Sequence, residues 1–302
     1  MRIGIFAGDV AGQAAVDELV TWAADVHDQG FPSIWLPQIF GLDAITISGV
    51  IGREVPDIEI GTAVVPTYPR HPMMLAQQAL TTNLLTGGRF SLGIGLSHQF
   101  VIETIMGMSF EKPLRHMREY LSILGPLVRE GTVSFSGETM SCNATVDITG
   151  AQPCPILVAA LGPQMLQLTG AVADGTITWM TGPQTLADHT TPTITAAASA
   201  NGRPSPRILA GIPICVTDDA AGARERAATQ FSIYGFLPSY RAMLDREGLE
   251  GPADIAIVGD EATVRSGIER FADSGVTDLL AVEFSTDPAE RTRTRDLLRS
   301  LL

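Results

Sequence analysis

The sequence predicts an α/β protein built as a (β/α)8 (TIM) barrel with insertions at its carboxyl-terminal face. Short apolar runs alternate with longer segments of helical periodicity, which is the pattern of parallel strands joined by crossover helices. There are eight such runs in the 302 residues of the chain. Barrels of this kind typically occupy about 250 residues as a single unit. We therefore expect one barrel domain that covers residues 1–302.

The expected strands are short and rich in β-branched residues. They cover residues 3–7, 33–37, 58–65, 90–96, 156–160, 176–180, 208–216 and 278–284. Most of them are apolar throughout instead of alternating between apolar and polar side chains. This is expected of strands that are covered by helices on one face and by a filled barrel interior on the other, so a closed barrel is favoured.

Helical segments fill the intervals between the strands. In the first interval, Leu19 and Ala23 belong to an apolar set at helical spacing that ends before Gly30, a common stop for a helix. Asp260 and Asp287 precede two later helical segments. Both are predicted as N-caps, because an aspartate side chain accepts hydrogen bonds from the free amides at a helix start.

Two segments interrupt this alternation. Residues 131–148 have the pattern of a β-hairpin, and residues 218–249 have that of additional helix and loop. Insertions in barrel enzymes usually lie at the end where substrate binds. We therefore expect both segments at the carboxyl-terminal face of the barrel.

The charge of the chain limits its partners. Its 33 acidic and 20 basic residues give a net charge of −13, which repels phosphate backbones and anionic lipids. Nucleic acid and membrane partners are therefore not expected. The chain opens on a strand-like run instead of a signal peptide, which predicts a cytoplasmic location. The three cysteines show no C-x-x-C spacing, so neither a disulfide framework nor a metal site is predicted.

Two segments are expected to shape the mouth of the barrel. The third strand leads into Pro66, Pro69 and Pro72, so its carboxyl end must open into an irregular, extended loop. The fourth strand carries Gly93 and Gly95 in alternation. Glycines inside a strand let a backbone or a flat ligand approach closely. A small-molecule site at these strand ends is the consequence.

These residues resemble those of the bacterial luciferase-like superfamily. The similarity lies in Gly61, Thr62, Val64, Pro66, Arg70 and Pro72, followed by the string Gly88-Arg89-Phe90 and then Leu92-Gly93-Ile94-Gly95. The later strings at 159–163 and 173–183 are similar to the branch that uses the deazaflavin coenzyme F420. The resemblance covers most of the chain. It implies an oxidoreductase that moves a hydride to or from a small organic substrate with F420, or alternatively FMN, and that forms a homodimer.

The resemblance also implies which residues hold the cofactor. The step from Ala63 to Val64 corresponds to a strand bulge, often with a non-proline cis peptide, behind the tricyclic ring. The turn at Gly162 corresponds to the site that receives the phosphate, which agrees with the free amides and positive dipole at a helix start. The cofactor residues expected in this way are Ala63, Val64, Gly95, Leu161, Gly162, Pro163, Trp179 and Thr181, with Gly182 as a possible addition at the phosphate.

The chain departs from the family pattern at two strand ends. The F420-dependent sugar-phosphate dehydrogenases of this superfamily carry an Asp-His pair after the second strand, where this chain has Pro37-Gln38. A sugar phosphate is therefore a poor substrate candidate. They carry a glutamate after the fourth strand, where this chain has His98. We predict His98 as the proton donor, because its ordinary pKa lies near neutrality, with Gln38 and Tyr68 as further candidates.

Other polar residues have two interpretations at this stage. Arg70 could meet the substrate or pair with a carboxylate, and Glu283 could act at a strand end or form a buried ion pair. His71 is expected to begin the following helix. His116 and His189 are expected at the surface, as isolated histidines usually are.

Three other functions remain as alternatives. An FMN-dependent monooxygenase with a reductase partner would use the same scaffold. A cofactor-binding barrel without turnover is conceivable, because Gln38 replaces a catalytic residue of characterised relatives. A barrel glycosidase would need two carboxylates about 5 to 10 Å apart at strand ends, for which the candidates are Asp9, Asp43, Glu103 and Glu283.

Overall fold

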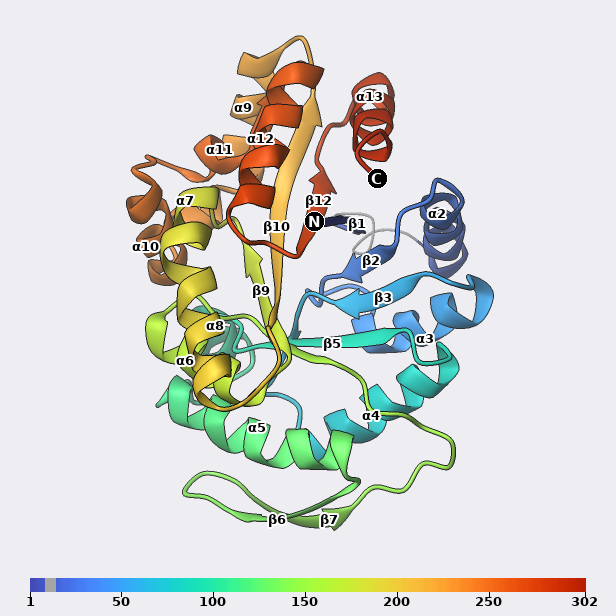
Figure 1. Ribbon diagram of the computed structural model, residues 1–302, viewed down its shortest axis with the longest axis vertical. Coiled ribbons are helices and arrows are strands. Elements are labelled where there is room, and N and C mark those ends of the chain that lie inside the picture. Colours follow the sequence, from blue (N-terminus) through green and yellow to red (C-terminus); the bar gives the residue numbers. More distant parts are fainter. Residues whose placement is uncertain (9–14) are drawn as a thin grey trace.

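A computed structural model describes residues 1–8 and 15–302. Its centre is a ring of parallel strands, visible in the middle of Figure 1. The ring consists of β1 (Arg2–Phe6), β2 (Ser33–Leu36), β3 (Glu59–Thr62), β5 (Phe90–Gly95), β8 (Ile156–Val158), β9 (Gly175–Trp179), β10 (Arg207–Val216) and β12 (Asp278–Glu283). Pairing of β9 with β10 and of β12 with β1 closes the ring. The prediction of a closed eight-stranded barrel is confirmed.

The strands differ from the prediction in two respects. The expected strand 58–65 is divided: β3 stops at Thr62, and a short strand β4 (Val65–Pro66) then pairs with β5. The strand β11 (Ile257–Gly259), which sequence analysis did not identify, pairs with β10 outside the ring. Its three residues are too few for a periodic pattern.

Helices surround the ring (Figure 1). Among the described residues, the α-helices before β8 are α2 (Val16–Asp28), α3 (Ala44–Glu54), α4 (Pro72–Leu85) and α5 (Pro113–Arg129). After β8 come α6 (Pro163–Val172), α7 (Pro183–Thr185), the π-helical turn η2 (Leu186–Thr190) and α8 (Thr191–Ala200), and the chain ends with α12 (Glu261–Asp273) and α13 (Pro288–Arg299). The predicted caps are confirmed, because Asp260 accepts a hydrogen bond from the amide of Thr263 and Asp287 accepts one from that of Ala289.

A compact set of side chains closes the barrel interior. Trp35, Leu157, Ile177, Leu209 and Leu280 form a buried cluster, and Ala63 and Val64 pack against it from the mouth. Gly61 makes room for the indole of Trp35, since a β-carbon at position 61 would overlap that ring. The barrel interior is therefore filled by side chains, and these form the bottom of the mouth.

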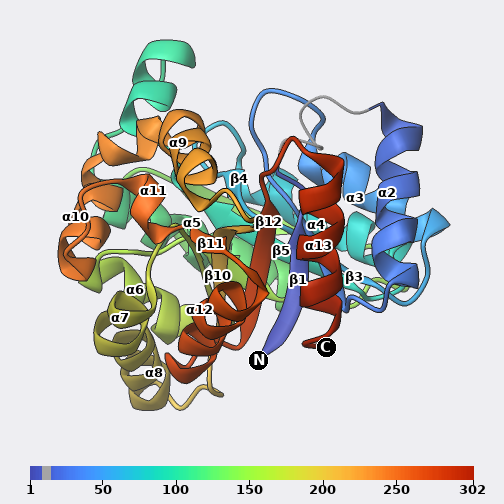
Figure 2. The ribbon, with the colours of Figure 1, turned by 90° about the horizontal axis from the view of Figure 1, so that it is seen from above.

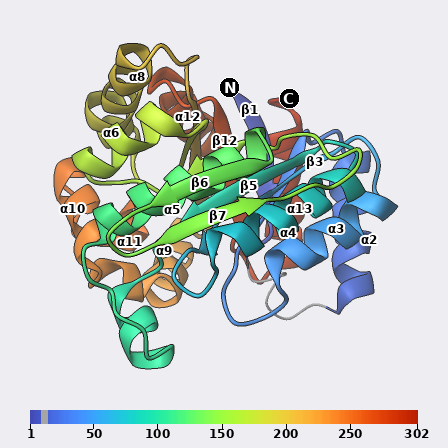
Figure 3. The ribbon, with the colours of Figure 1, turned by 90° about the horizontal axis from the view of Figure 1, so that it is seen from below.

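The predicted hairpin is present, but in a different place from the one expected. Its strands β6 (Thr132–Ser136) and β7 (Ser141–Thr145) follow α5 and lead into β8, so they belong to a connection that enters a strand. Figures 1 and 3 show the hairpin along the outer side of α5. The carboxylate of Glu119 on α5 accepts hydrogen bonds from the amides of Glu138, Thr139 and Met140 in its turn. These bonds hold the hairpin against the helix.

Insertions at the carboxyl ends of the strands follow β5 and β10. The loop after β5 contains the π-helical turn η1 (Val101–Ile105), drawn in teal and projecting from the molecule in Figure 2. The insertion after β10 contains α9 (Ala220–Gln230), the 3-10 turn η3 (Ser232–Gly235), α10 (Pro238–Glu247) and α11 (Pro252–Ile255). The additional helices predicted within 218–249 are confirmed.

No helix within residues 1–8 and 15–302 is long and apolar enough to cross a membrane.

Candidate functional site at the barrel mouth

The break between β3 and β4 is a non-proline cis peptide between Ala63 and Val64. The predicted bulge is therefore present. The amide of Ala63 still bonds to the carbonyl of Leu36 on β2 at 2.8 Å, whereas Val65 is aligned with Ile94 of β5. The bulge thus transfers the strand from one neighbour to the other. It also places Ala63 and Val64, both half-buried, on the floor of the mouth.

Gly95 is the last residue of β5 and lies against this floor. A β-carbon at position 95 would lie 2.7 Å from Cγ2 of Val64 and 3.2 Å from Cβ of Ala159. Glycine is therefore required if Val64 is to keep its place. The structure brings together three segments that sequence analysis singled out, around residues 63–64, 95 and 159.

The helix start at Gly162 is open. Gly162 is the N-cap of α6 and Pro163 is its first residue, as predicted. An added β-carbon at Gly162 would have no atom within 4 Å, and the first turn of α6 carries no acidic side chain. Amides at such a helix start point toward any anion that approaches.

The position of this turn depends on a residue that sequence analysis placed wrongly. His189 is buried, not at the surface, and its Nε2 donates a hydrogen bond of 2.9 Å to the carbonyl of Leu161. The contact joins η2 to the turn before α6. It fixes the orientation of Leu161, one of the predicted cofactor residues.

Trp179 lies at the end of β9, facing the mouth. Its indole stacks on Phe6, with ring centroids 5.7 Å apart, and meets the edges of Phe231 and Tyr234. Its Nε1 is buried and has no hydrogen-bond partner. Thr181 is buried too, but its hydroxyl bonds to the carbonyl of Trp179 at 3.3 Å. Thr181 is thus engaged with the backbone, whereas the indole nitrogen is free to meet a ligand.

A carboxylate beside Gly182 opposes the expectation that this residue adds phosphate contacts. Gly182 is the N-cap of α7, and the carboxylate of Glu247 from α10 fills the space beside it. That carboxylate accepts a hydrogen bond from the amide of Thr185. A second anion would be repelled there, so α6 offers the open helix start.

His98 follows β5 in the loop that carries η1. Its backbone neighbour Ser97 adopts a left-handed conformation with φ 62°, which turns the chain at the strand end. The half-buried ring of His98 lies 5.9 Å from that of Tyr240, centroid to centroid. Burial lowers the pKa of His98. The neutral ring is then the main form at pH 7, and it can accept a proton or donate one hydrogen bond.

Gln38 has a structural contact that its sequence position did not reveal. Its Oε1 accepts a hydrogen bond of 2.8 Å from the amide of Ala44 at the start of α3. Asp43, the N-cap of the same helix, pairs with Arg70 at 2.6 Å. The ion-pair interpretation of Arg70 is therefore favoured. His71 caps α4 through Nδ1, as predicted.

A second aromatic group at the mouth was missed. The rings of Tyr68 and His116 stack at 3.9 Å, and Thr67 shares a hydrogen bond of 2.9 Å with His116. His116 is therefore not a surface residue. Burial lowers the pKa of His116 to about 4 and raises that of Tyr68 to about 12, with Glu103 adding to the latter. The spacing of His116 and Tyr120 on one face of α5 was the available sequence signal.

Two buried polar atoms at the mouth have no hydrogen-bond partner among the described residues and could bond to a cofactor. The indole nitrogen of Trp179 and the hydroxyl of Tyr68 are two of the four buried side-chain atoms that lack a partner within the described part of the chain. A buried polar atom without a partner is costly, and a ligand or water usually completes it. Trp179 is the last residue of β9, and Tyr68 follows Thr67, whose amide donates a hydrogen bond to the carbonyl of Gly95. The residues present fit a flat, phosphate-bearing group.

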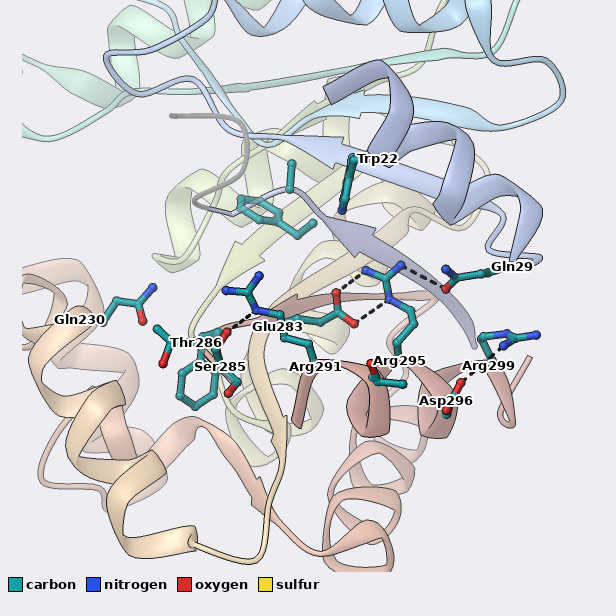
Figure 4. A pocket seen from close by; sticks show the side chains of 14 residues that line it. Trp22, Gln29, Gln230, Glu283, Ser285, Thr286, Arg291, Arg295, Asp296 and Arg299 are labelled. Carbon is teal, nitrogen blue, oxygen red and sulfur yellow. Dashed lines mark hydrogen bonds and ion pairs between the residues drawn. The ribbon is translucent and has the colours of Figure 1, made fainter. Parts of the chain in front are cut away.

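A cavity of about 390 Å³ lies beside the mouth (Figure 4). It is bounded by α2, α13 and the carboxyl ends of β1 and β12. Four of its charged side chains form ion pairs, Glu283 with Arg295 and Arg299 with Asp296, and Arg291 donates a hydrogen bond to the carbonyl of Ser285. The ion-pair interpretation of Glu283 is favoured, and none of the predicted cofactor residues lines this cavity.

The carboxylates considered for a glycosidase are engaged elsewhere. Asp43 and Glu283 are each paired with an arginine, and Glu103 accepts a hydrogen bond from Gln99 at 2.9 Å. Asp9 lies outside the described residues. These contacts give no support to a pair of catalytic carboxylates.

The comparison with known families decides the assignment. A family described as luciferase-like monooxygenase matches residues 1–278. The chain belongs to this family. Within the luciferase-like family, it is 26% identical over 270 residues to the 5,10-methylenetetrahydromethanopterin reductase of Methanolobus tindarius, which covers 89% of this chain and 82% of that one. It is 27% identical to the F420-dependent glucose-6-phosphate dehydrogenase of Kineococcus radiotolerans, with coverage of 86% and 80%.

The fold of this luciferase-like protein also matches a solved structure. The coenzyme F420-dependent tetrahydromethanopterin reductase of Methanopyrus kandleri superposes with a TM-score of 0.81 at 19% identity, covering 99% of this chain and 97% of that one. The resemblance noted from the sequence is thus confirmed at the level of family and fold.

Proposed function

We propose that this luciferase-like protein is an F420-dependent oxidoreductase that transfers a hydride to or from a small organic substrate at the barrel mouth. Relatives named as F420-dependent enzymes support the oxidoreductase branch. The observation that carries the proposal is the close approach of Val64 and Ala159 to Gly95, where an added β-carbon would meet both side chains. The open helix start at Gly162 comes three residues after Ala159 in the chain.

Different residues of the mouth bind the ring system and the phosphate of the cofactor. Ala63 and Val64 support one face of the ring system, and Gly95 leaves room for the side chain of Val64. The amides at the start of α6 receive the phosphate, since Gly162 is exposed and no acidic side chain lies in the first turn. The indole nitrogen of Trp179 supplies a hydrogen bond that no protein group now takes. When bound, the deazaflavin supplies the hydride chemistry.

Oxidation or reduction of the substrate also requires a group that accepts or donates a proton. His98 is neutral at pH 7 because burial lowers its pKa, so it suits the role of an acceptor when a substrate hydroxyl is oxidised. The hydroxyl of Tyr68 keeps its proton up to about pH 12. It therefore suits a hydrogen bond to a substrate carbonyl. Gln38 retains its amide group as a further donor while its oxygen holds α3.

Titration with purified cofactors tests the proposal. The full-length protein is expected to bind oxidised F420 with micromolar or tighter affinity, measured by the change in deazaflavin fluorescence. FMN, titrated in parallel, is expected to bind more weakly. Tight FMN binding without F420 binding, together with oxygen consumption on reduced FMN, would refute the proposal and establish the monooxygenase alternative.

A further inference from the structure

Three loops at the carboxyl-terminal face expose apolar side chains. They are residues 36–42 after β2, residues 96–110 after β5, and residues 231–237 between α9 and α10. Ile39, Phe40, Phe100, Ile105, Ile233 and Phe236 have exposed fractions between 52 and 85%. Figures 2 and 3 show the three loops on the same side of the molecule. We call these six residues the apolar rim.

The rim loops carry almost no charge. Residues 36–42 and 231–237 contain no Asp, Glu, Lys or Arg, and residues 96–110 contain only Glu103. Nothing in these loops can neutralise a phosphate or a carboxylate, and Glu103 would repel one. Exposed apolar side chains gathered at one place usually mark a binding surface. The charge pattern therefore favours an uncharged ligand.

The rim is continuous with the candidate site. Trp179 contacts Tyr234 with a centroid distance of 5.9 Å, and Tyr234 contacts Tyr240 at 5.0 Å. Tyr240 in turn lies 5.9 Å from His98. This chain of aromatic rings runs from the end of β9 to the loop after β5. His98 and Tyr234 lie in two of the rim loops, and Gln38 lies in the third. The occupant of the rim that these positions favour is therefore the substrate itself.

We infer that the substrate is an uncharged lipophilic molecule whose hydrocarbon part lies on the apolar rim while its reactive oxygen enters the mouth. This inference rests on the proposed function, whose substrate class it specifies. Each methylene that leaves water is stabilised by about 0.8 kcal/mol when fully buried, or roughly fourfold in affinity. The stabilisation per methylene is smaller on a partly open rim, where the chain stays in contact with water. Affinity is then expected to rise steadily with chain length.

A series of methyl ketones tests the inference. Binding of 2-butanone, 2-hexanone and 2-octanone to the full-length protein is measured by ligand-observed NMR titration. The dissociation constant is expected to fall roughly two- to fourfold per added methylene. Octyl phosphate and 2-octanone are compared in the Gly162→Glu variant, which blocks the proposed phosphate site, and octyl phosphate is expected to bind more weakly there. No dependence of the dissociation constant on chain length, or tighter binding of octyl phosphate than of 2-octanone in that variant, overturns the inference.

Substitutions in the apolar rim test whether its side chains contact the hydrocarbon chain of the ketone. Phe236→Ser and Phe100→Ser should each weaken 2-octanone binding at least fivefold with little change for 2-butanone. Leu84→Ser, which changes a leucine that is 43% exposed at the far end of α4, is the matched control and should behave like the wild type. Unchanged octanone binding in both rim variants contradicts the inference. So does a shift from dimer to monomer in those variants without loss of ketone binding, because a second copy would then be the occupant.

The same samples separate this inference from the proposed function. F420 binding is measured on each of them by fluorescence. Length-dependent ketone binding without any F420 binding would leave the lipophilic surface in place and remove the redox assignment. F420 binding without any dependence of ketone affinity on chain length would support the redox assignment and contradict the lipophilic substrate.

Discussion

The imidazole of His116 lies face to face on the ring of Tyr68, with the centroids 3.9 Å apart and an angle of 6° between the planes. His116 begins the buried face of α5, and Tyr68 belongs to the loop after β4. The stack therefore joins two walls of the mouth. It also holds the unpartnered hydroxyl of Tyr68 in place.

This burial predicts a loss of stability in mild acid. The unfolded chain protonates His116 as the pH falls below about 6.5, whereas burial lowers the pKa in the folded protein to about 4. The unfolded state therefore binds more protons between these values. The free energy of unfolding then decreases as the pH falls from 6.5 to 4, by about 1–2 kcal/mol after solvent screening.

Urea unfolding between pH 7.5 and 4.5 measures the effect. His116→Phe keeps an aromatic ring and removes the titration, so its stability should depend less on pH than that of the wild type. Tyr120→Phe on the same helix is the control, because it removes no group that titrates in this pH range, and it should retain the wild-type dependence. Equal slopes for His116→Phe and the wild type would show that the stack does not exclude the proton.

The fit of Gly95 against Val64 predicts a coupled pair of mutations. Gly95→Ala places a β-carbon 2.7 Å from Cγ2 of Val64 and should destabilise the protein by about 1–3 kcal/mol through overpacking. Val64→Ala removes the atom that is struck. The double variant should recover part of the loss, with a coupling energy above about 0.5 kcal/mol in denaturant unfolding.

A matched pair checks that the coupling is local. Gly95→Ala combined with Val65→Ala removes the same methyl groups from the neighbouring valine, which is not among the close contacts of position 95. These two changes should be additive. Additivity in the Val64 pair as well would mean that the bulge does not touch Gly95 as described.

Glu247 is expected to stabilise the start of α7. Its carboxylate accepts a hydrogen bond from the amide of Thr185 and lies at the positive end of the helix. Glu247→Ala should lower the free energy of unfolding by about 0.5–2 kcal/mol, and Glu247→Gln should lose less because it can still accept the bond. Glu250→Ala, at an exposed position nearby, should be close to neutral in thermal unfolding.

The fold was predictable because its signals are local. Runs such as 208–216 are apolar over their whole length, and caps such as Asp260 act within one helical turn. The strand β11 escaped because three residues carry no period. The hairpin was recognised from its turn pattern, but its place along α5 depends on Glu119, which lies in another element.

The site was predictable only in part. The residues 63–64 and 162–163 have the backbone geometry that the resemblance implied, whereas their role in binding a cofactor is still a prediction. His116 and His189 were misplaced because their partners, Tyr68 and Leu161, are distant in sequence. The contact of Glu247 with α7 was invisible for the same reason. The tertiary fold sets the partner of each residue; the sequence shows only that His116 shares one face of α5 with Tyr120.

The most direct test of the proposed site concerns the helix start of α6. Gly162→Glu places a negative charge where the phosphate should bind, and Gly251→Glu places the same charge at another open N-cap that precedes a proline, at the start of α11. Both variants and the wild type are titrated with oxidised F420 by fluorescence. A dissociation constant raised at least tenfold by Gly162→Glu alone is the predicted result. Equal affinity in all three proteins would contradict the assignment of this turn to the phosphate.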